Sequence, residues 1–499
     1  MNVSGSQRQY TLSFYTIVIA FVLAQLVKLC FLAPMPETGG DAAQKWFLAK
    51  QLADGSIEFV RSIDAVNHHF LRWATWIPAT LLVSAFGDSL TVYYLSTFLI
   101  SLLAAILFIG LFFRHFGAFA AILFSVVWYF DPQLDRALFQ LLPTGASLLP
   151  LALLILAFQG HLDEKISDRG LVLSSSIFLF WLYGAKETNI FFAPGVFAAV
   201  WILTDARHAF GVVLTCLALY VGEAIALSWL FAESLPGGRL LALLAPDAMH
   251  LNTMINSGRI LNETDALWDA GIISRWYTVM RLHVPIYIPS IAVFMVVLAS
   301  FAYRPSREPA ARLAFCISVF AVSFVLLTSF FIVSIDPVRL GQPLRPRYIA
   351  ILLPLCYFIL TFGALQMVSG RAYGNLGRVA LAAICASLVV ASTYFADFSK
   401  RFLREGYNTL LFTTRYPVRM PLSETAQYFA VLGESIKDAD CELPTPEFKK
   451  LYFGLMYVGS ENNGLTRFQE LDARCEQAAA FRSQFDASVE DNAVRDTGK

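Results

Sequence analysis

Residues 90–113 read LTVYYLSTFLISLLAAILFIGLFF and contain no charged side chain. An α-helix of this length extends about 36 Å, which is enough to cross the hydrocarbon core of a bilayer, about 30 Å thick. A helix of the same length on a water-soluble protein would carry polar side chains along one face. The stretch therefore predicts a membrane-spanning helix.

The rest of the chain has the same character, because 57% of its 499 residues are hydrophobic and only 15% are charged. The composition predicts an all-α polytopic membrane protein with about eleven transmembrane helices. We expect the first of them to be retained as a span, because it is too long for the core of a signal peptide. The further apolar stretches lie near 11–33, 143–159, 209–232, 284–303, 312–334, 348–368 and 379–396, with shorter ones near 118–130, 170–185 and 188–204.

The charges in the short loops predict an orientation, because inner loops are enriched in Lys and Arg. With the N-terminus inside, nearly every short inner loop is basic, and the long loops and the tail face outward. The weak point is the region 170–204, which forms either an external hairpin or one long helix with a polar kink; the inner arginines favour the hairpin. The inner-loop residues are Arg114, Lys165, Arg169, Arg207, Arg304, Arg307, Arg312, Arg371 and Arg378.

The chain divides near residue 398. Residues 1–397 have the composition of a membrane domain, whereas 398–499 carry frequent charges and predict a small external α+β domain. Cys441 and Cys475 are the only cysteines outside the predicted spans, and in an oxidising compartment they form either a disulfide or two unpaired thiols. The formal net charge of zero excludes a nucleic-acid partner, which needs a surplus of Lys and Arg.

Asp41 begins the stretch DAAQKWFLAKQLADG, directly after the first span. Ala42, Trp46, Ala49 and Leu52 recur at helical spacing, so we expect an amphipathic helix that lies along the membrane surface. Two roles are open for Asp41. It caps the free backbone N–H groups of this helix, or it belongs to an active site.

Three segments resemble the GT-C superfamily of polytopic glycosyltransferases, in the branch of the protein O-mannosyltransferases, the aminoarabinose transferases and the rhizobial galacturonosyltransferases. The resemblance covers about residues 15 to 370. The first segment is GGDAAQKWFLAKQLADG with NHHFLRWATWIPATLLVSAFGDS. It contains an acidic residue, a predicted helix, a stretch with histidines and an apolar helix that ends in Phe-Gly. The second is YGAKETNIFFAPG and the third is RPRYIAILLP.

The resemblance implies a GT-C-like bundle that transfers a sugar from a polyprenyl-phosphate donor to an extracytoplasmic acceptor, either a lipid-linked glycan such as lipid A or the lipopolysaccharide core, or a protein. It further implies an inner-membrane protein with an active site that faces the periplasm. In the family the acid of the first loop is the general base, a role that falls on Asp41. Such a reaction also needs cations to stabilise the charge of the departing phosphate.

The candidates for donor binding are Lys186, Asp131 and the residues in the two Arg-containing motifs. Arg suits phosphate because its planar guanidinium donates two parallel hydrogen bonds. The alternatives are headgroup contact for the late arginines, an ion pair with Glu187 for Lys186, ordinary loop histidines, and a helix cap before Pro132 for Asp131. The motif residues are Arg72, His68 and His69 in NHHFLRW and Arg345, Arg347 and Tyr348 in QPLRPRY.

A divalent metal is left open, because the sequence has Gly-Gly-Asp where the mannosyltransferases tend to show Asp-Glu, and it has no clear Asp-x-Asp motif. The alternative function is a secondary transporter or a flippase of a lipid-linked or small solute. The long external loops and the missing two-half repeat disfavour it.

Overall fold

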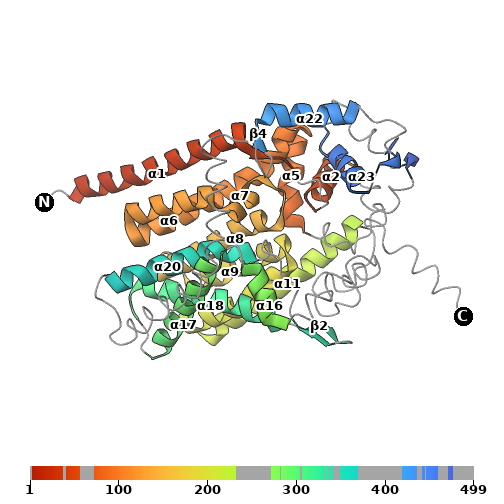
Figure 1. Cartoon of the computed structure of the whole chain (residues 1–499). Coiled ribbons are helices and arrows are strands. Elements are labelled where there is room, and N and C mark those ends of the chain that lie inside the picture. Colours follow the sequence, from red (N-terminus) through yellow and green to blue (C-terminus); the bar gives the residue numbers. More distant parts are fainter. Residues whose placement is uncertain are drawn as a thin grey trace, which may run out of the picture.

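The computed structural model describes residues 3–36, 41–56, 72–231, 271–280, 283–303, 306–330, 332–335, 338–340, 349–368, 419–434, 441–443, 445–458, 470–471 and 473–475. Helices dominate these residues, and six of the helices are long and apolar enough to cross a membrane. The protein is thus a multi-pass membrane protein of helical architecture. Figure 1 shows the long helices running roughly alongside one another. The predicted span near 379–396 lies outside the described residues.

The six long helices are α1 (Val3–Leu32), α6 (Leu90–Phe130), α8 (Pro143–Leu162), α11 (Ala206–Phe231), α17 (Val284–Tyr303) and α18 (Pro309–Phe330). Shorter apolar helices accompany them, namely α5 (Trp73–Phe86), α9 (Asp168–Ala185), η1 (Glu187–Phe192) with α10 (Ala193–Leu203), and η2 (Ala350–Leu352) with α20 (Leu353–Val368). The remaining helices are α2 (Asp41–Ala53), α7 (Pro132–Phe139), α16 (Gly271–Met280), α22 (Leu422–Glu434) and α23 (Thr445–Leu455).

Helix α6 folds back on itself at Gly117. The φ of Gly117 is 85°, in the left-handed region that glycine enters without strain. The rings of Phe112 and Phe124 are 4.1 Å apart, although twelve residues of continuous helix would separate them by about 18 Å. The two apolar stretches predicted near 90–113 and 118–130 are therefore the two arms of one helical hairpin.

Helices α9 and α11 run in the same direction. Val172 lies beside Gly211, Cys216 contacts the carbonyl oxygen of Ser176, and Phe180 packs on Tyr220, so the residue numbers rise together. The chain between them must return to the end where α9 began. The segment of η1 and α10 makes this return, which agrees with the predicted hairpin at Lys186 and excludes one long kinked helix.

The bundle has two distinct ends. The loop end, as we call it, holds the start of α5, the start of α7, the junction of α9 with η1, and α2. At the opposite end Arg114 forms an ion pair with Asp163, and His115 bonds to Gln159. The basic residues assigned to inner loops that the structure describes lie at this opposite end.

Helix α2 is buried on every side, so the prediction of an amphipathic helix on the membrane surface is wrong. All residues from Ala42 to Gln51 are buried, including both lysines. The covering comes from α5 and from the tail, since α23 packs on α2 and Lys50 donates to the carbonyl oxygen of Val458 at 2.8 Å. Lys50 also pairs with Asp88 at 3.0 Å, which compensates part of the cost of burying its charge.

The described part of the tail is attached to the helices that precede it. Strand β4 (Arg419–Met420) pairs antiparallel with β1 (Ala33–Pro34), directly after α1. Helix α22 packs on α1, and Figure 1 shows α22 and α23 in blue beside α2 and α5. The boundary predicted near 398 lies outside the described residues.

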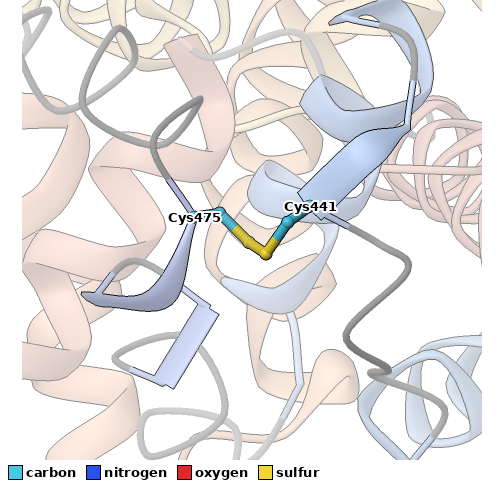
Figure 2. The surroundings of a disulfide bond; sticks show 2 residues. All are labelled: Cys441 and Cys475. Carbon is cyan, nitrogen blue, oxygen red and sulfur yellow. A yellow bond between two sulfur atoms is a disulfide. The ribbon is translucent and has the colours of Figure 1, made fainter.

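Cys441 and Cys475 form a disulfide, the first of the two alternatives left open by the sequence (Figure 2). The bond joins residues on either side of α23, whose end carries Val458 to Lys50. It therefore fixes the segment of the tail that covers α2.

One predicted span ends earlier than expected. Helix α18 stops at Phe330, and the residues that follow form a small antiparallel hairpin of β2 (Ile332–Ile335) and β3 (Val338–Leu340). The run IVSI at 332–335 is rich in β-branched side chains, which favour strands. An apolar run of this kind cannot be distinguished from the end of a helix by hydropathy alone.

Candidate functional site at the loop end

Four of the residues selected from the sequence lie at the loop end. Asp41 is the first residue of α2, Arg72 directly precedes α5, Asp131 lies between α6 and α7, and Lys186 lies between α9 and η1. The side chain of Asp41 is outside the described part of the structure. So are the remaining candidates, which are His68, His69, Arg345, Arg347 and Tyr348.

Arg72 is paired with Glu187 by two hydrogen bonds. Its Nε donates to Oε2 at 3.1 Å and its Nη2 donates to Oε1 at 2.5 Å. Arg72 is buried and Glu187 is partly buried. The pair joins the segment NHHFLRW to the segment GAKET, 115 residues later. A phosphate that bound Arg72 would have to share its guanidinium group with Glu187.

Trp73 extends this contact to a third element. Its indole Nε1 donates to Oε1 of Glu223, on α11, at 2.5 Å. The ring of Trp73 lies against Gly184, where an added Cβ would approach Cζ2 to 2.2 Å. Glu223 was not among the residues selected from the sequence, although a signal was present, since Glu223 is the one acid between residues 208 and 231.

Lys186 is a buried residue at the point where α9 ends. Its backbone N–H closes α9 on Leu182, and its carbonyl oxygen accepts from the N–H of Asn189. Asn189 donates in turn to the hydroxyl of Ser147, on α8, at 2.7 Å. The turn that holds Lys186 is thereby fixed to a neighbouring helix.

Asp131 is fully used as a hydrogen-bond acceptor. Its Oδ1 accepts from the N–H groups of Gln133 and Leu134, at the start of α7. Its Oδ2 accepts from His283 Nε2 at 3.0 Å and from the Tyr357 hydroxyl at 2.8 Å. Burial opposes the charge of this carboxyl group, but His283 and the hydrogen bonds outweigh it and hold its pKa below the ordinary value. The expected alternative of a cap before Pro132 is confirmed.

Asp135, four residues later, lies between two cations. It contacts Lys28 Nζ on α1 at 2.5 Å and Arg419 Nη2 at 2.5 Å. The cations are further held by backbone carbonyl oxygens, Lys28 by that of Tyr129 and Arg419 by that of Leu32. Burial opposes the charge on Asp135, yet Arg419 and Lys28 together keep its pKa below the usual range.

The four carboxylates Asp131, Asp135, Glu187 and Glu223 each accept from a named donor, so each has a structural partner. Within the described part of the chain, no group of three or more His, Cys, Asp or Glu residues is arranged to hold a metal ion. These contacts join α1 and the tail to α7, and η1 and α11 to the start of α5, at the loop end.

No protein-family model matches the sequence, and no curated protein is significantly similar to it. Among solved structures, the chain is similar to the oligosaccharyltransferase AglB from the archaeon Archaeoglobus fulgidus, solved in complex with an inhibitory peptide and a dolichol-phosphate. The TM-score is 0.42 and the identity 12%, with 88% of this chain covered. The chain spans 59% of that protein. This distant likeness carries no argument about function.

Proposed function

We propose that the protein is a membrane glycosyltransferase that moves a sugar from a polyprenyl-phosphate donor to a hydroxyl group of an extracytoplasmic acceptor. The observation that carries the proposal is the ion pair of Arg72 with Glu187. It joins two of the three segments by which the sequence resembles the GT-C glycosyltransferases. Helix α2, which begins with Asp41, packs on α5, the helix that follows Arg72.

In the proposed reaction Asp41 accepts the proton of the acceptor hydroxyl, whose oxygen forms a bond to C1 of the sugar. The bond between C1 and the phosphate oxygen breaks, and polyprenyl phosphate leaves with the electron pair. The choice of Asp41 as the base is supported by the resemblance and by the engagement of Asp131, Asp135, Glu187 and Glu223 with cations or hydrogen-bond donors at the same end of the bundle. Lys186, Arg345 and Arg347 are the proposed contacts of the departing phosphate.

The enclosure of α2 suits such a base. A catalytic group must be held within hydrogen-bond reach of the proton it takes, and a misplacement of about 1 Å can reduce the rate about 100-fold. Helix α2 is enclosed by α5 and by the tail, and the disulfide closes the tail near it. The sugar and the acceptor are not specified by these contacts.

The test uses a synthetic polyprenyl-phosphate donor that carries a radiolabelled sugar. Transfer of this sugar by the purified protein in liposomes is measured with envelope glycolipids and envelope proteins as acceptors. We expect Asp41→Asn to lower the rate by about 10²–10⁴-fold and to leave donor binding intact. The matched control is Asp54→Asn, which changes an exposed acid just beyond the other end of α2. Transfer by Asp41→Asn at the wild-type rate would refute the role of Asp41. Flux of a solute across the liposome membrane without sugar transfer would refute the proposed glycosyltransferase activity.

A further inference from the structure

Glu223 occupies an unusual place in α11. The helix exposes many of its apolar side chains, and the neighbours Val221 and Ile225 are 54% and 67% exposed. Glu223 itself is only 7% exposed. An acid in a membrane span is costly unless it has a partner or a function. The burial of Glu223 shows that its side chain turns away from the lipid and toward the neighbouring helices.

Trp73 is a partner of Glu223. The indole N–H of Trp73 donates to Glu223 Oε1 at 2.5 Å, and the ring of Trp73 also packs against Phe180 of α9. Gly184 provides the room for this ring, because a Cβ at Gly184 would lie 2.2 Å and 2.3 Å from two of its carbon atoms. The indole is therefore held at two points of α9, Phe180 and Gly184, and at one point of α11.

Arg72, the residue before Trp73, is also held by an acid, which comes from a different element. Arg72 binds Glu187 in η1 through two hydrogen bonds. Two consecutive residues at the start of α5 are thus each held by an acid, one from η1 and one from α11. Helix α5 packs on α2, so the position of its first turn bears on the position of the helix that begins at Asp41.

We infer that Glu223 is a positioning residue of the enzyme: through Trp73 it fixes the start of α5 and, with it, the helix that carries Asp41. The inference rests on the proposed function for its effect on catalysis, but the contact itself can be tested without it. In the proposed reaction Glu223 does not touch the reacting atoms. It acts through its acceptor oxygen, so its amide analogue should replace it.

The first experiment compares transfer kinetics. Glu223→Gln keeps an acceptor oxygen and should retain kcat within about twofold, whereas Glu223→Leu and Trp73→Phe should each lower kcat about ten- to hundredfold, with a smaller change in KM for the donor. Gly184→Ala should act like Glu223→Leu because it displaces the indole. Gly222→Ala is its control, since a Cβ there meets nothing within 4 Å. The double variant Trp73→Phe with Glu223→Leu should be no worse than either single variant.

The second experiment does not depend on catalysis. Thr75 is buried in the first turn of α5, so Thr75→Cys reports whether this turn stays packed. A membrane-impermeant maleimide should label Thr75→Cys slowly in the wild type, in Glu223→Gln and in Gly222→Ala, and at least ten times faster in Glu223→Leu and Gly184→Ala. Each rate is corrected with the same variant that lacks the new cysteine.

The two experiments separate the two proposals. If the wild type transfers no sugar while the labelling pattern appears, the glycosyltransferase is refuted and the anchoring of α5 by Glu223 stands. Equally slow labelling in Glu223→Leu and in the wild type would overturn the inference. So would additive losses of kcat in the double variant, because Trp73 and Glu223 would then act independently.

Discussion

Arg419 Nη2 lies 2.5 Å from Asp135 Oδ2, and the two residues are 284 positions apart in the sequence. Both are buried, and Lys28 contacts the other oxygen of the same carboxylate. Removing one partner of a buried ion pair leaves a charge without compensation, which costs about 3–5 kcal/mol. The pair therefore makes the tail part of the folded membrane protein instead of an appendage to it.

Arg419→Gln should accordingly lower the thermal unfolding midpoint of the detergent-purified protein by several degrees and expose the tail to protease. Arg474→Gln is the control, because Arg474 is an exposed arginine of the same tail and its replacement should change the midpoint little. Equal midpoints for Arg419→Gln and the wild type would mean that the tail is held without this contact.

The disulfide between Cys441 and Cys475 closes a segment of 34 residues. Cross-linking a segment of this length restricts the unfolded chain and stabilises the fold by about 3–4 kcal/mol. The double variant Cys441→Ser with Cys475→Ser should unfold at a lower temperature and no longer respond to a reducing agent. Cys30→Ser changes a cysteine that is free and exposed, and should leave both the midpoint and its response to reductant unchanged.

The sequence predicts the apolar helices well but not what covers them. The run Ala42–Gln51 has the spacing of an amphipathic helix, yet its polar face is buried as deeply as its apolar face. The reason is the tail, which places the Val458 carbonyl oxygen on Lys50. A local pattern cannot show that a segment about 400 residues later will cover the polar face.

In the candidate site, too, local features could be predicted and long-range contacts could not. The cap formed by Asp131 could be predicted because it involves only its next three residues. The contacts of Arg419 with Asp135 and of Trp73 with Glu223 could not be predicted, because each joins segments that are far apart in the chain. Periodicity describes one helix at a time, whereas ion pairs of this kind depend on how the helices are assembled.

Asp131 is predicted to be structural and not catalytic. Asp131→Asn retains Oδ1 for the cap of α7 but places an amide opposite the donors of His283 and Tyr357, so it should destabilise the protein by about 1–3 kcal/mol. The rate of transfer per folded molecule should be close to that of the wild type. A loss of transfer without a loss of stability would instead assign Asp131 to the active site.

The pH dependence of stability gives a second measure of this carboxyl group. Because its pKa in the folded protein is lowered, its contribution is fully present above the ordinary value of about 3.9 and is lost as the pH falls through the lower folded pKa. Between pH 5 and pH 2, roughly, the unfolding midpoint of the wild type should fall more steeply than that of Asp131→Asn. Parallel curves would show that Asp131 is not held as a carboxylate.

Arg345 and Arg347 lie outside the described residues, so their role remains a prediction from the sequence. If one of them binds the departing phosphate, its replacement by Lys keeps the charge but loses the two parallel hydrogen bonds, and turnover should fall even where donor binding partly survives. Donor binding by equilibrium dialysis and turnover are measured for each variant. Equal tolerance of Lys and Gln at both positions would show that these arginines only anchor the span that follows.

The last prediction concerns the side of the membrane on which the loop end lies. Three exposed residues serve as reporters when each is replaced by cysteine, namely Asp54 after α2, Ser423 in the tail, and Lys165 at the opposite end of the bundle. The basic short loops at the opposite end predict that Lys165 faces the cytoplasm. In intact cells an impermeant maleimide should then label Asp54→Cys and Ser423→Cys, and should label Lys165→Cys only after the membrane is opened. The reverse pattern would place α2 in the cytoplasm and exclude an extracytoplasmic acceptor. Labelling of Asp54→Cys together with protection of Ser423→Cys would contradict the packing of the tail on α2. Ser423 lies on α22, which packs on α23, and the tail must lie on the same side as α2 for Lys50 to reach Val458.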